Sequence, residues 1–351
     1  MTKIIAGIQQ LGIGVSNLSE AREWYKKILG YDVIIFDEAA EASLMVRYTD
    51  NKPQKRHAIL AYNMKSGGGF EVWQYTSRKP VPANFDIQVG DLGIFICKIK
   101  APNVHKTYNN FRDNNVNIIS EISNSPKGKP HFFFRDPYNN LFEVEEGYDW
   151  LLKQAKVTGG NSGVIIGVSD MENSIKFYSQ ILGYETIVYD QEQVFDDFKD
   201  LPGGNEIYRR VLLKHSEKRK GPFSPMLGDS TIELVQAKNR SVRKIYENRL
   251  WGDLGYIHLC FDVIGMDHLK KECEEAGFHF TVDSAESFDM GEAAGHFSYI
   301  EDPDGTLIEF VETHKIPIIK KIGWYFNIVN KKHKRPLSMW FFKVLNASRK
   351  V

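Results

Sequence analysis

The most constraining feature of this sequence is that two motifs each occur twice. The first contains Ile-Gly-Val-Ser, a Phe/Trp-Tyr pair and then Ile-Leu-Gly-Tyr, and it begins at Ile13 and again at Ile166. The second begins with Gly-Asp-Leu-Gly at Gly90 and again at Gly252, and it ends with Asp-Pro and a later glutamate. Internal repeats define the structural units of a chain and have to be found before a fold is assigned. The 351 residues are therefore expected to form four related modules.

The first module has the pattern of a β-α-β-β-β unit. Gln9 to Val15 is predicted to be a strand, and Ser16-Asn17 provides oxygens that can cap a helix. Apolar residues then recur at helical spacing, and Gly30 falls where a left-handed residue would end the helix. Strand-like stretches follow at 32–36, at 44–48 with 58–62, and at 70–75. The third module repeats this order with insertions at 191–201 and 214–222.

The repeats predict two halves, residues 1–150 and 158–313, joined by a linker near 148–160. Residues 314–351 form a basic, aromatic C-terminal tail, which carries ten Lys/Arg and no acid from Lys315 onward. The rest of the chain has 35 basic and 45 acidic residues. Two interpretations of the tail stay open. It could bind a membrane surface as an amphipathic segment, or its aromatic residues could pack on the acidic body or across a dimer.

The composition is that of a soluble globular protein, with 42% apolar and 26% charged residues. Three cysteines form no CxxC pattern, which argues against a disulfide framework and favours a reducing compartment. The N-terminus has no long apolar signal segment, and no stretch is long enough to span a membrane. We therefore expect a cytoplasmic protein, either a monomer or a homodimer. No motif indicates a nucleic-acid partner.

The order of these motifs resembles the vicinal oxygen chelate superfamily, which includes glyoxalase I, extradiol dioxygenases, methylmalonyl-CoA epimerase and bleomycin or fosfomycin resistance proteins. The resemblance covers roughly residues 5 to 312, in four copies. It implies an α+β fold of four βαβββ modules, paired into two cupped mixed sheets of the glyoxalase type. Since one fold hosts many functions, the chemistry has to be argued from the site.

In the family, a metal is held by one position on each first strand and one on each last strand of a module pair. In this chain the last-strand positions are Glu71, Glu143, Glu233 and Glu309, and the first-strand positions are Gln10, Ile96, Gly163 and His258. Ile96 and Gly163 offer no ligand atom. If modules pair 1–4 and 2–3, one cup gathers an intact set and the other is defective. If they pair 1–2 and 3–4, both cups are defective, so the first pairing is the simpler one.

The intact set would be Gln10, Glu71, His258 and Glu309. An amide oxygen, an imidazole and two carboxylates suit a divalent metal, with Zn²⁺ as the first choice and Ni²⁺, Co²⁺ or Mn²⁺ as alternatives. The set looks like that of the zinc-type glyoxalases. This resemblance implies that Glu309 is the catalytic base and that Glu71 is the candidate on the opposite side of the substrate.

Several residue assignments stay open at this point. A strand glutamate could guard a sheet edge, His258 could be a core histidine, and a one-residue slip would exchange Gln9 for Gln10. Two histidines could also line a cup, and three arginines could hold a substrate carboxylate or form rim salt bridges; these are His131, His296, Arg47, Arg209 and Arg210. The segments 191–205 and 67–69 could shape the mouth of the site.

Three functions are compatible with this sequence. The first is a metal-dependent lyase or isomerase of the glyoxalase I type, acting through an enediolate on a small hydroxycarbonyl or thiol adduct. The second is a non-catalytic protein that binds or sequesters an aromatic or antibiotic-like small molecule. An Fe(II) extradiol dioxygenase is disfavoured because it requires two histidine ligands, and only His258 occupies a first-strand ligand position.

Overall fold

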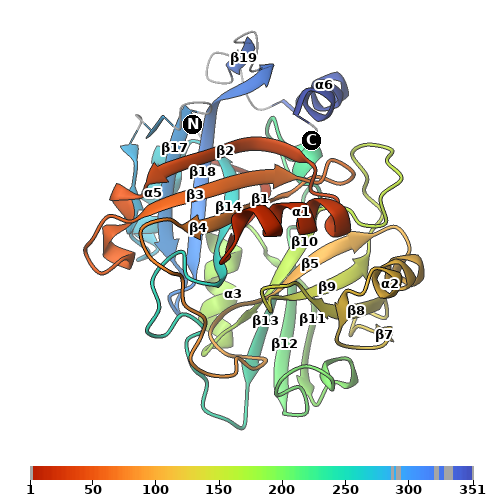
Figure 1. The fold of residues 1–351 in the computed structure, drawn as a ribbon. Coiled ribbons are helices and arrows are strands. Elements are labelled where there is room, and N and C mark those ends of the chain that lie inside the picture. The colour runs from red at the N-terminus through yellow and green to blue at the C-terminus, as the bar shows by residue number, and fades with distance from the viewer. Residues whose placement is uncertain (1–2, 286–287, 290–293, 320–323, 328–334, 350–351) are drawn as a thin grey trace.

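A computed structural model describes residues 3–285, 288–289, 294–319, 324–327 and 335–349. The fold is α+β, with two curled mixed sheets lying one above the other in Figure 1. The first module contains β1 (Ile4–Gly14), α1 (Leu18–Leu29), β2 (Val33–Glu41), η1 (Ser43–Tyr48), β3 (Lys55–Tyr62) and β4 (Gly69–Tyr75). The second contains β5 (Gly93–Ala101), α2 (Val104–Asp113), β6 (Asn117–Ile118), β7 (Ser123–Asn124), β8 (Pro130–Arg135) and β9 (Leu141–Glu146).

The third and fourth modules repeat the order of the first two. The third contains β10 (Asn161–Gly167), α3 (Met171–Gln180), β11 (Thr186–Gln193), η2 (Asp196–Phe198), β12 (Tyr208–Lys214), α4 (Ser224–Leu227) and β13 (Thr231–Ala237). The fourth contains β14 (Gly255–Ile264), α5 (Met266–Glu275), β15 (Val282–Asp283), β16 (Phe288–Asp289), β17 (Ala294–Glu301) and β18 (Leu307–Ile319). In the tail, β19 (Trp324–Asn327) and α6 (Met339–Arg349) follow.

The sheets pair modules from opposite halves of the sequence. One sheet has the order β15-β17-β18-β14-β1-β4-β3-β2 and joins modules 4 and 1 through antiparallel β1 and β14. The other has the order β11-β12-β13-β10-β5-β9-β8-β6 and joins modules 3 and 2 through β10 and β5. We call the inner, concave faces of these two sheets the first cup and the second cup, respectively. The predicted fold class of paired βαβββ modules is confirmed.

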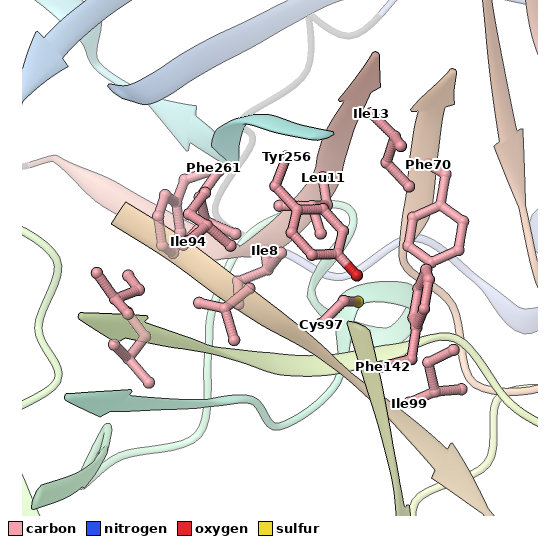
Figure 2. Packing of buried hydrophobic residues seen from close by; sticks show 14 of the residues in the cluster. Ile8, Leu11, Ile13, Phe70, Ile94, Cys97, Ile99, Phe142, Tyr256 and Phe261 are labelled. Atoms are coloured by element: carbon pink, nitrogen blue, oxygen red, sulfur yellow. The ribbon is translucent and has the colours of Figure 1, made fainter. Parts of the chain in front are cut away.

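A shared apolar core fixes which side chains face each cup. Figure 2 shows Leu11 and Ile13 of β1 pointing into the same core as Cys97 and Ile99 of β5. Because successive strand residues point to opposite faces, burying Leu11 and Ile13 directs the intervening Gly12 toward the first cup. The apolar alternation therefore determines the geometry of the polar face.

The repeated Tyr and Asp-Pro motifs connect the two modules of each half. The Tyr25 hydroxyl on α1 donates a hydrogen bond to Asp136 in the β8–β9 hairpin at 2.6 Å. At the matching position, Tyr178 on α3 donates to Asp302 in the β17–β18 hairpin at 2.8 Å. Each bond is buried, so the repeated motif has a structural role: it links modules that are neighbours in sequence, while the sheets link the halves.

One strand prediction is wrong. Residues 44–48 form part of the 3₁₀ helix η1 and not a strand. The β2 and β3 strands pair along their whole length, from Val33 opposite Tyr62 to Glu41 opposite Lys55. The chain between them therefore has to turn, and η1 makes that turn with Met45 buried beneath it.

The tail packs against the body of the protein where the structure describes it. Strand β18 pairs with β19, and helix α6 buries Phe341, Phe342 and Leu345 in the apolar cluster of the first cup. Figure 1 shows α6 beside β2. Residues 320–323, 328–334 and 350–351 of the predicted basic tail lie outside the described residues. Within the described part of the chain, the structure contains no helix with the length and apolar character needed to cross a membrane.

Candidate metal centre

The predicted ligand set converges in the first cup. Gln10, Glu71, His258 and Glu309 lie on four neighbouring strands, β1, β4, β14 and β18. Ligand atoms of Glu71, His258 and Glu309 all lie within 4.8 Å of one another. The His258 Nε2 atom is 3.0 Å from Glu309 Oε2 and 3.4 Å from Glu71 Oε2, and Gln10 Nε2 donates to Glu71 Oε2 at 3.0 Å. All four side chains are buried.

The cluster contains one orphaned ligand atom and one isolated ion pair. Gln10 Oε1 is buried and has no hydrogen-bond partner among the described residues, whereas His258 Nε2 and Glu309 Oε2 face each other at 3.0 Å. Buried polar atoms are normally paired, so an orphaned amide oxygen beside an imidazole and two carboxylates indicates that a cation fits between them. An amide oxygen, an imidazole nitrogen and a carboxylate oxygen all donate a lone pair to a cation. The residues therefore fit a divalent metal ion.

The charges at this centre are strongly coupled. Burial works to lower the pKa of His258, but the carboxylates of Glu309 and Glu71 outweigh it and raise the pKa to about 10. For Glu71, burial acts to raise the pKa, but contact with His258 and the charge of Arg56 lower it overall. Without a bound ion, a proton on His258 therefore balances part of the negative charge. A metal ion would have to displace that proton.

Three neighbouring residues confine the His258 ring. Gly12 lies opposite it on β1, and a Cβ at Gly12 would be 2.4 Å from Cε1 of His258. The Trp251 ring stacks on the imidazole at 6.5 Å between centroids, and the Tyr299 hydroxyl is 3.5 Å from Nδ1. Only a residue without a side chain fits at Gly12. Sequence analysis missed these three positioning residues, and for Gly12 the only signal was its place in the β1 strand.

The structure also separates Gln9 from Gln10. The β1–β14 register shifts between Ile8 and Gln10, and because of this irregularity both glutamines line the cup. Gln10 reaches Glu71, whereas Gln9 donates to Asp262 at 3.5 Å and accepts from Cys260. Gln10 is therefore the one that joins the cluster.

A cavity of about 550 Å³ opens from this cluster. Its inner end is formed by Gln10, Glu71 and Glu309. Its walls come from several separate segments, including α4 of the third module and α6 of the tail, and they are mostly apolar. The aromatic and aliphatic side chains in these walls include Phe36, Tyr62, Trp73, Trp251, Phe297 and Leu345. Volumes of this size are typical of small-molecule sites.

The second cup contains the two other predicted glutamates but is filled by the chain's own cations. Lys98 Nζ lies 3.0 Å from Glu143 and 2.6 Å from Glu233, and Arg210 Nε lies 2.6 Å from Glu233. Burial opposes a charged Lys98, but the two glutamates outweigh it and raise the pKa of its ammonium. Ile96 occupies the position that corresponds to His258, as expected for a cup without a metal.

The remaining predicted polar residues divide between the cups and the surface. His131 is buried in the second cup and bonds Glu143 at 2.6 Å, whereas His296 lines the first-cup cavity and bonds Asp283 at 2.6 Å. The three arginines all have acidic partners: Arg47 is exposed near Glu301, Arg209 pairs with Asp190 and Glu172, and Arg210 pairs with Asp197 and Glu233.

The segments expected at the mouth of the site have other positions. The 191–205 insertion carries Asp197 and Phe198, which lie against Arg210 and close the second cup, not the first. Gly67 packs against the backbone of Met226, where a Cβ would be 1.3 Å from its carbonyl oxygen. Met226 itself lines the first-cup cavity, so the 67–69 turn supports the wall behind α4.

Comparisons with known proteins agree with this architecture. The model of the Glyoxalase/Bleomycin resistance protein/Dioxygenase superfamily matches residues 7–144 and 162–310, so the chain belongs to this superfamily. Glyoxalase I from Zea mays has a similar structure, with a TM-score of 0.55 and 15% sequence identity over 89% of this chain and 92% of that chain. A proposed dioxygenase from Bacillus subtilis gives a TM-score of 0.56 and 12% identity, over 89% and 86%. A comparison with curated proteins finds no match.

Proposed function

We propose that the protein is a metal-dependent lyase or isomerase of the glyoxalase I type, with one active site in the first cup. The observation that carries this proposal is the convergence of four ligand-type side chains, with an orphaned amide oxygen among them, at the inner end of a cavity of ligand size; they are Gln10, Glu71, His258 and Glu309. The fold shared with maize glyoxalase I is consistent with it, although 15% identity does not extend to the reaction.

The chemistry follows from the groups at the centre. A divalent ion, with Zn²⁺ as the first choice, would polarise two neighbouring oxygens of a hydroxycarbonyl substrate or thiol adduct and make an adjacent C–H more acidic. We assign to Glu309 the role of accepting the proton from that carbon, because its carboxylate is buried and lines the inner end of the cavity. Glu71, on the opposite side of His258, is the candidate to return it. Gln10 orients Glu71 through their hydrogen bond.

Metal content is the first test. The purified full-length protein should retain about one divalent ion per chain, measured by elemental analysis, and isomerase and epimerase assays on uncharged hydroxycarbonyls and hemithioacetals of neutral thiols, with that ion present, should detect turnover. The His258→Ala variant should lose the ion, because it removes one of the ligands that define a small site. Ile96→Val changes the matching position of the second cup and should keep it. Unchanged metal occupancy in His258→Ala would show that this site is wrong.

A second function, non-catalytic binding of an aromatic small molecule, is favoured by the largely apolar walls of the same cavity. A protein that carries no ion but binds such a ligand would fit it. An Fe(II) dioxygenase fits less well, because it requires a second histidine ligand, and His296, which lines the cavity, is engaged by Asp283. A cytoplasmic location stays a prediction, supported by three free, buried cysteines. The oligomeric state and membrane contact by the tail also stay predictions.

A further inference from the structure

We propose that the first cup takes an uncharged substrate with a ring-bearing, apolar body, and that it does not take an adduct of glutathione or coenzyme A. For the polar end of the substrate, where two neighbouring oxygens would face the cluster, this proposal rests on the proposed function. For the apolar body of the substrate, it rests on the cavity walls.

The walls carry few groups that could solvate an ionic ligand. The aromatic rings of Trp73 and Trp251 meet edge to face, with 4.8 Å between centroids, at the inner end beside His258. Farther out, Phe223 and Met226 of the third module and Leu345 of the tail line the cavity, and all three are nearly fully buried in the protein. A ligand body that fills this space exchanges water for apolar and aromatic surface, which favours rings and disfavours charges.

The charges that line the cavity disfavour an anion. Among the described lining residues there are four carboxylates, and the only Lys or Arg is Arg56. The Arg56 guanidinium is buried and donates to the backbone oxygen of Glu38 at 2.9 Å, so it is committed to the wall. The carboxylates are at Glu38, Glu41, Glu71 and Glu309. Even a bound divalent ion leaves this lining net negative. Glutathione and coenzyme A adducts are anions and would meet repulsion with few cations to compensate it.

A set of matched probes tests the proposal on the full-length, metal-loaded protein. 2-Hydroxyacetophenone has a neutral ring and an α-hydroxyketone, dihydroxyacetone has the same chelating atoms without the ring, and 4-(hydroxyacetyl)benzoate adds a negative charge at the far side of the same ring. Binding is followed by tryptophan fluorescence and calorimetry. We expect 2-hydroxyacetophenone to bind about tenfold tighter than dihydroxyacetone, because the ring buries apolar area. 4-(Hydroxyacetyl)benzoate and S-hexylglutathione should bind more weakly than 2-hydroxyacetophenone. Equal or tighter binding of S-hexylglutathione would overturn the proposal.

Two variants sharpen this test without touching the cluster. Phe223→Ala should weaken 2-hydroxyacetophenone about fivefold and leave dihydroxyacetone and metal content unchanged, because it removes only apolar wall. Phe195→Ala, which changes a buried aromatic residue of the second cup, is the matched control and should leave both affinities unchanged. Glu41→Lys, at the exposed rim, should strengthen binding of 4-(hydroxyacetyl)benzoate about threefold at low salt through its charge. Equal effects of Phe223→Ala and Phe195→Ala would contradict the assigned wall.

The ring preference can be separated from the metal. Acetophenone lacks the second oxygen and needs no ion, so it is measured on chelator-treated protein. If no metal is ever retained, the proposed function fails, but acetophenone binding that is weakened by Phe223→Ala still supports an apolar ligand. If the protein holds metal and binds dihydroxyacetone as tightly as 2-hydroxyacetophenone, the proposed function stands and the ring inference is wrong.

Discussion

The first and second cups bury equivalent pairs of glutamates but balance their charge differently. In the first cup, Gly12 makes room for His258, and in the second cup Ile165 and Ile96 fill the two corresponding positions with apolar side chains. The cups also differ at the residue that pairs with the last-strand glutamate. In the first cup Cys260 lies opposite Glu309, whereas in the second cup Lys98 lies opposite Glu143. Two buried carboxylates require a cation. The chain provides fixed cations in the second cup, whereas in the first the two glutamates face the titratable imidazole of His258.

The same contrast holds one strand farther out. Arg210 of β12 contacts Glu233. In the first sheet, Leu60 pairs with Glu71, and the residue that corresponds to Arg210 lies two positions before Leu60. That residue is the small Ala58. The first sheet therefore has no cationic side chain at the position that Arg210 occupies in the second. The guanidinium packs over Phe198 and closes the second cup. Two copies of one architecture have therefore become a candidate site and an ionic core.

The largest difference between the cups is expected in turnover, when a last-strand glutamate is neutralised in each cup in turn. Glu309→Gln should lower turnover by about 10²–10⁴-fold, because an amide cannot accept the substrate proton. Glu143→Gln removes the equivalent acid from the second cup and should change stability and not the rate per folded enzyme. Steady-state kinetics on both variants, with metal content checked, make the comparison. Similar rate losses in the two variants would contradict the division of roles.

Lys98, the cation of the second cup, should contribute more to stability than Cys260, which occupies the matching position in the first cup. Lys98→Ala leaves Glu143 and Glu233 without the ammonium between them, and it should destabilise the protein by about 3–5 kcal/mol. Cys260→Ala, at the matching position, should cost less than about 1.5 kcal/mol because no charge is left unpaired. Urea denaturation of both variants measures the difference. Equal losses would show that Lys98 does not neutralise this pair.

Gly12 should be required for the metal and not for the fold alone. In Gly12→Ala the new methyl group meets the His258 ring, so metal affinity should fall by about 10- to 100-fold, as for other changes that misorient a ligand. Ile165→Val trims the equivalent side chain in the second cup and should leave metal affinity unchanged. Competition with a chromogenic chelator gives both affinities. Full metal affinity in Gly12→Ala would mean that His258 does not bind the ion.

Acid should weaken the second cup over a defined pH range. Burial acts to raise the pKa of Glu233, but Arg210 and Lys98 lower it from its ordinary value of 4.5 to about 2. A depressed folded-state pKa adds stability that is complete above about 4.5 and is lost as the pH falls toward 2, a loss on the order of 3 kcal/mol. Glu233→Gln should flatten this part of the stability profile, measured by denaturation between pH 2 and 6. An unchanged slope would assign the loss to other acids.

Much of the architecture could be predicted from repeated residues. Tyr25, Asp136 and the glutamates recur because each module reuses the same local packing, so position in the repeat predicts position on a strand. The convergence of Gln10 with His258 follows from only one of the two module pairings that the sequence allows. The alternation of apolar and polar residues determines which face of a strand is buried, but not which strand lies next to it. Residues 44–48 have strand character, yet the long β2–β3 pairing requires a turn there.

Other parts of the site have no signal in the repeats. Trp251 lies in a loop, and Phe223, Met226 and Leu345 reach the cavity from an insertion in the third module and from the tail. The sequence by itself determined four modules and which cup retained ligand-type side chains, because periodicity and residue chemistry are local properties. The tertiary structure alone decided that modules 1 and 4 share a sheet, that Lys98 neutralises the second cup, and that distant segments enclose the first. Those outcomes depend on contacts between residues more than a hundred positions apart, and such contacts are fixed by burial of the common core.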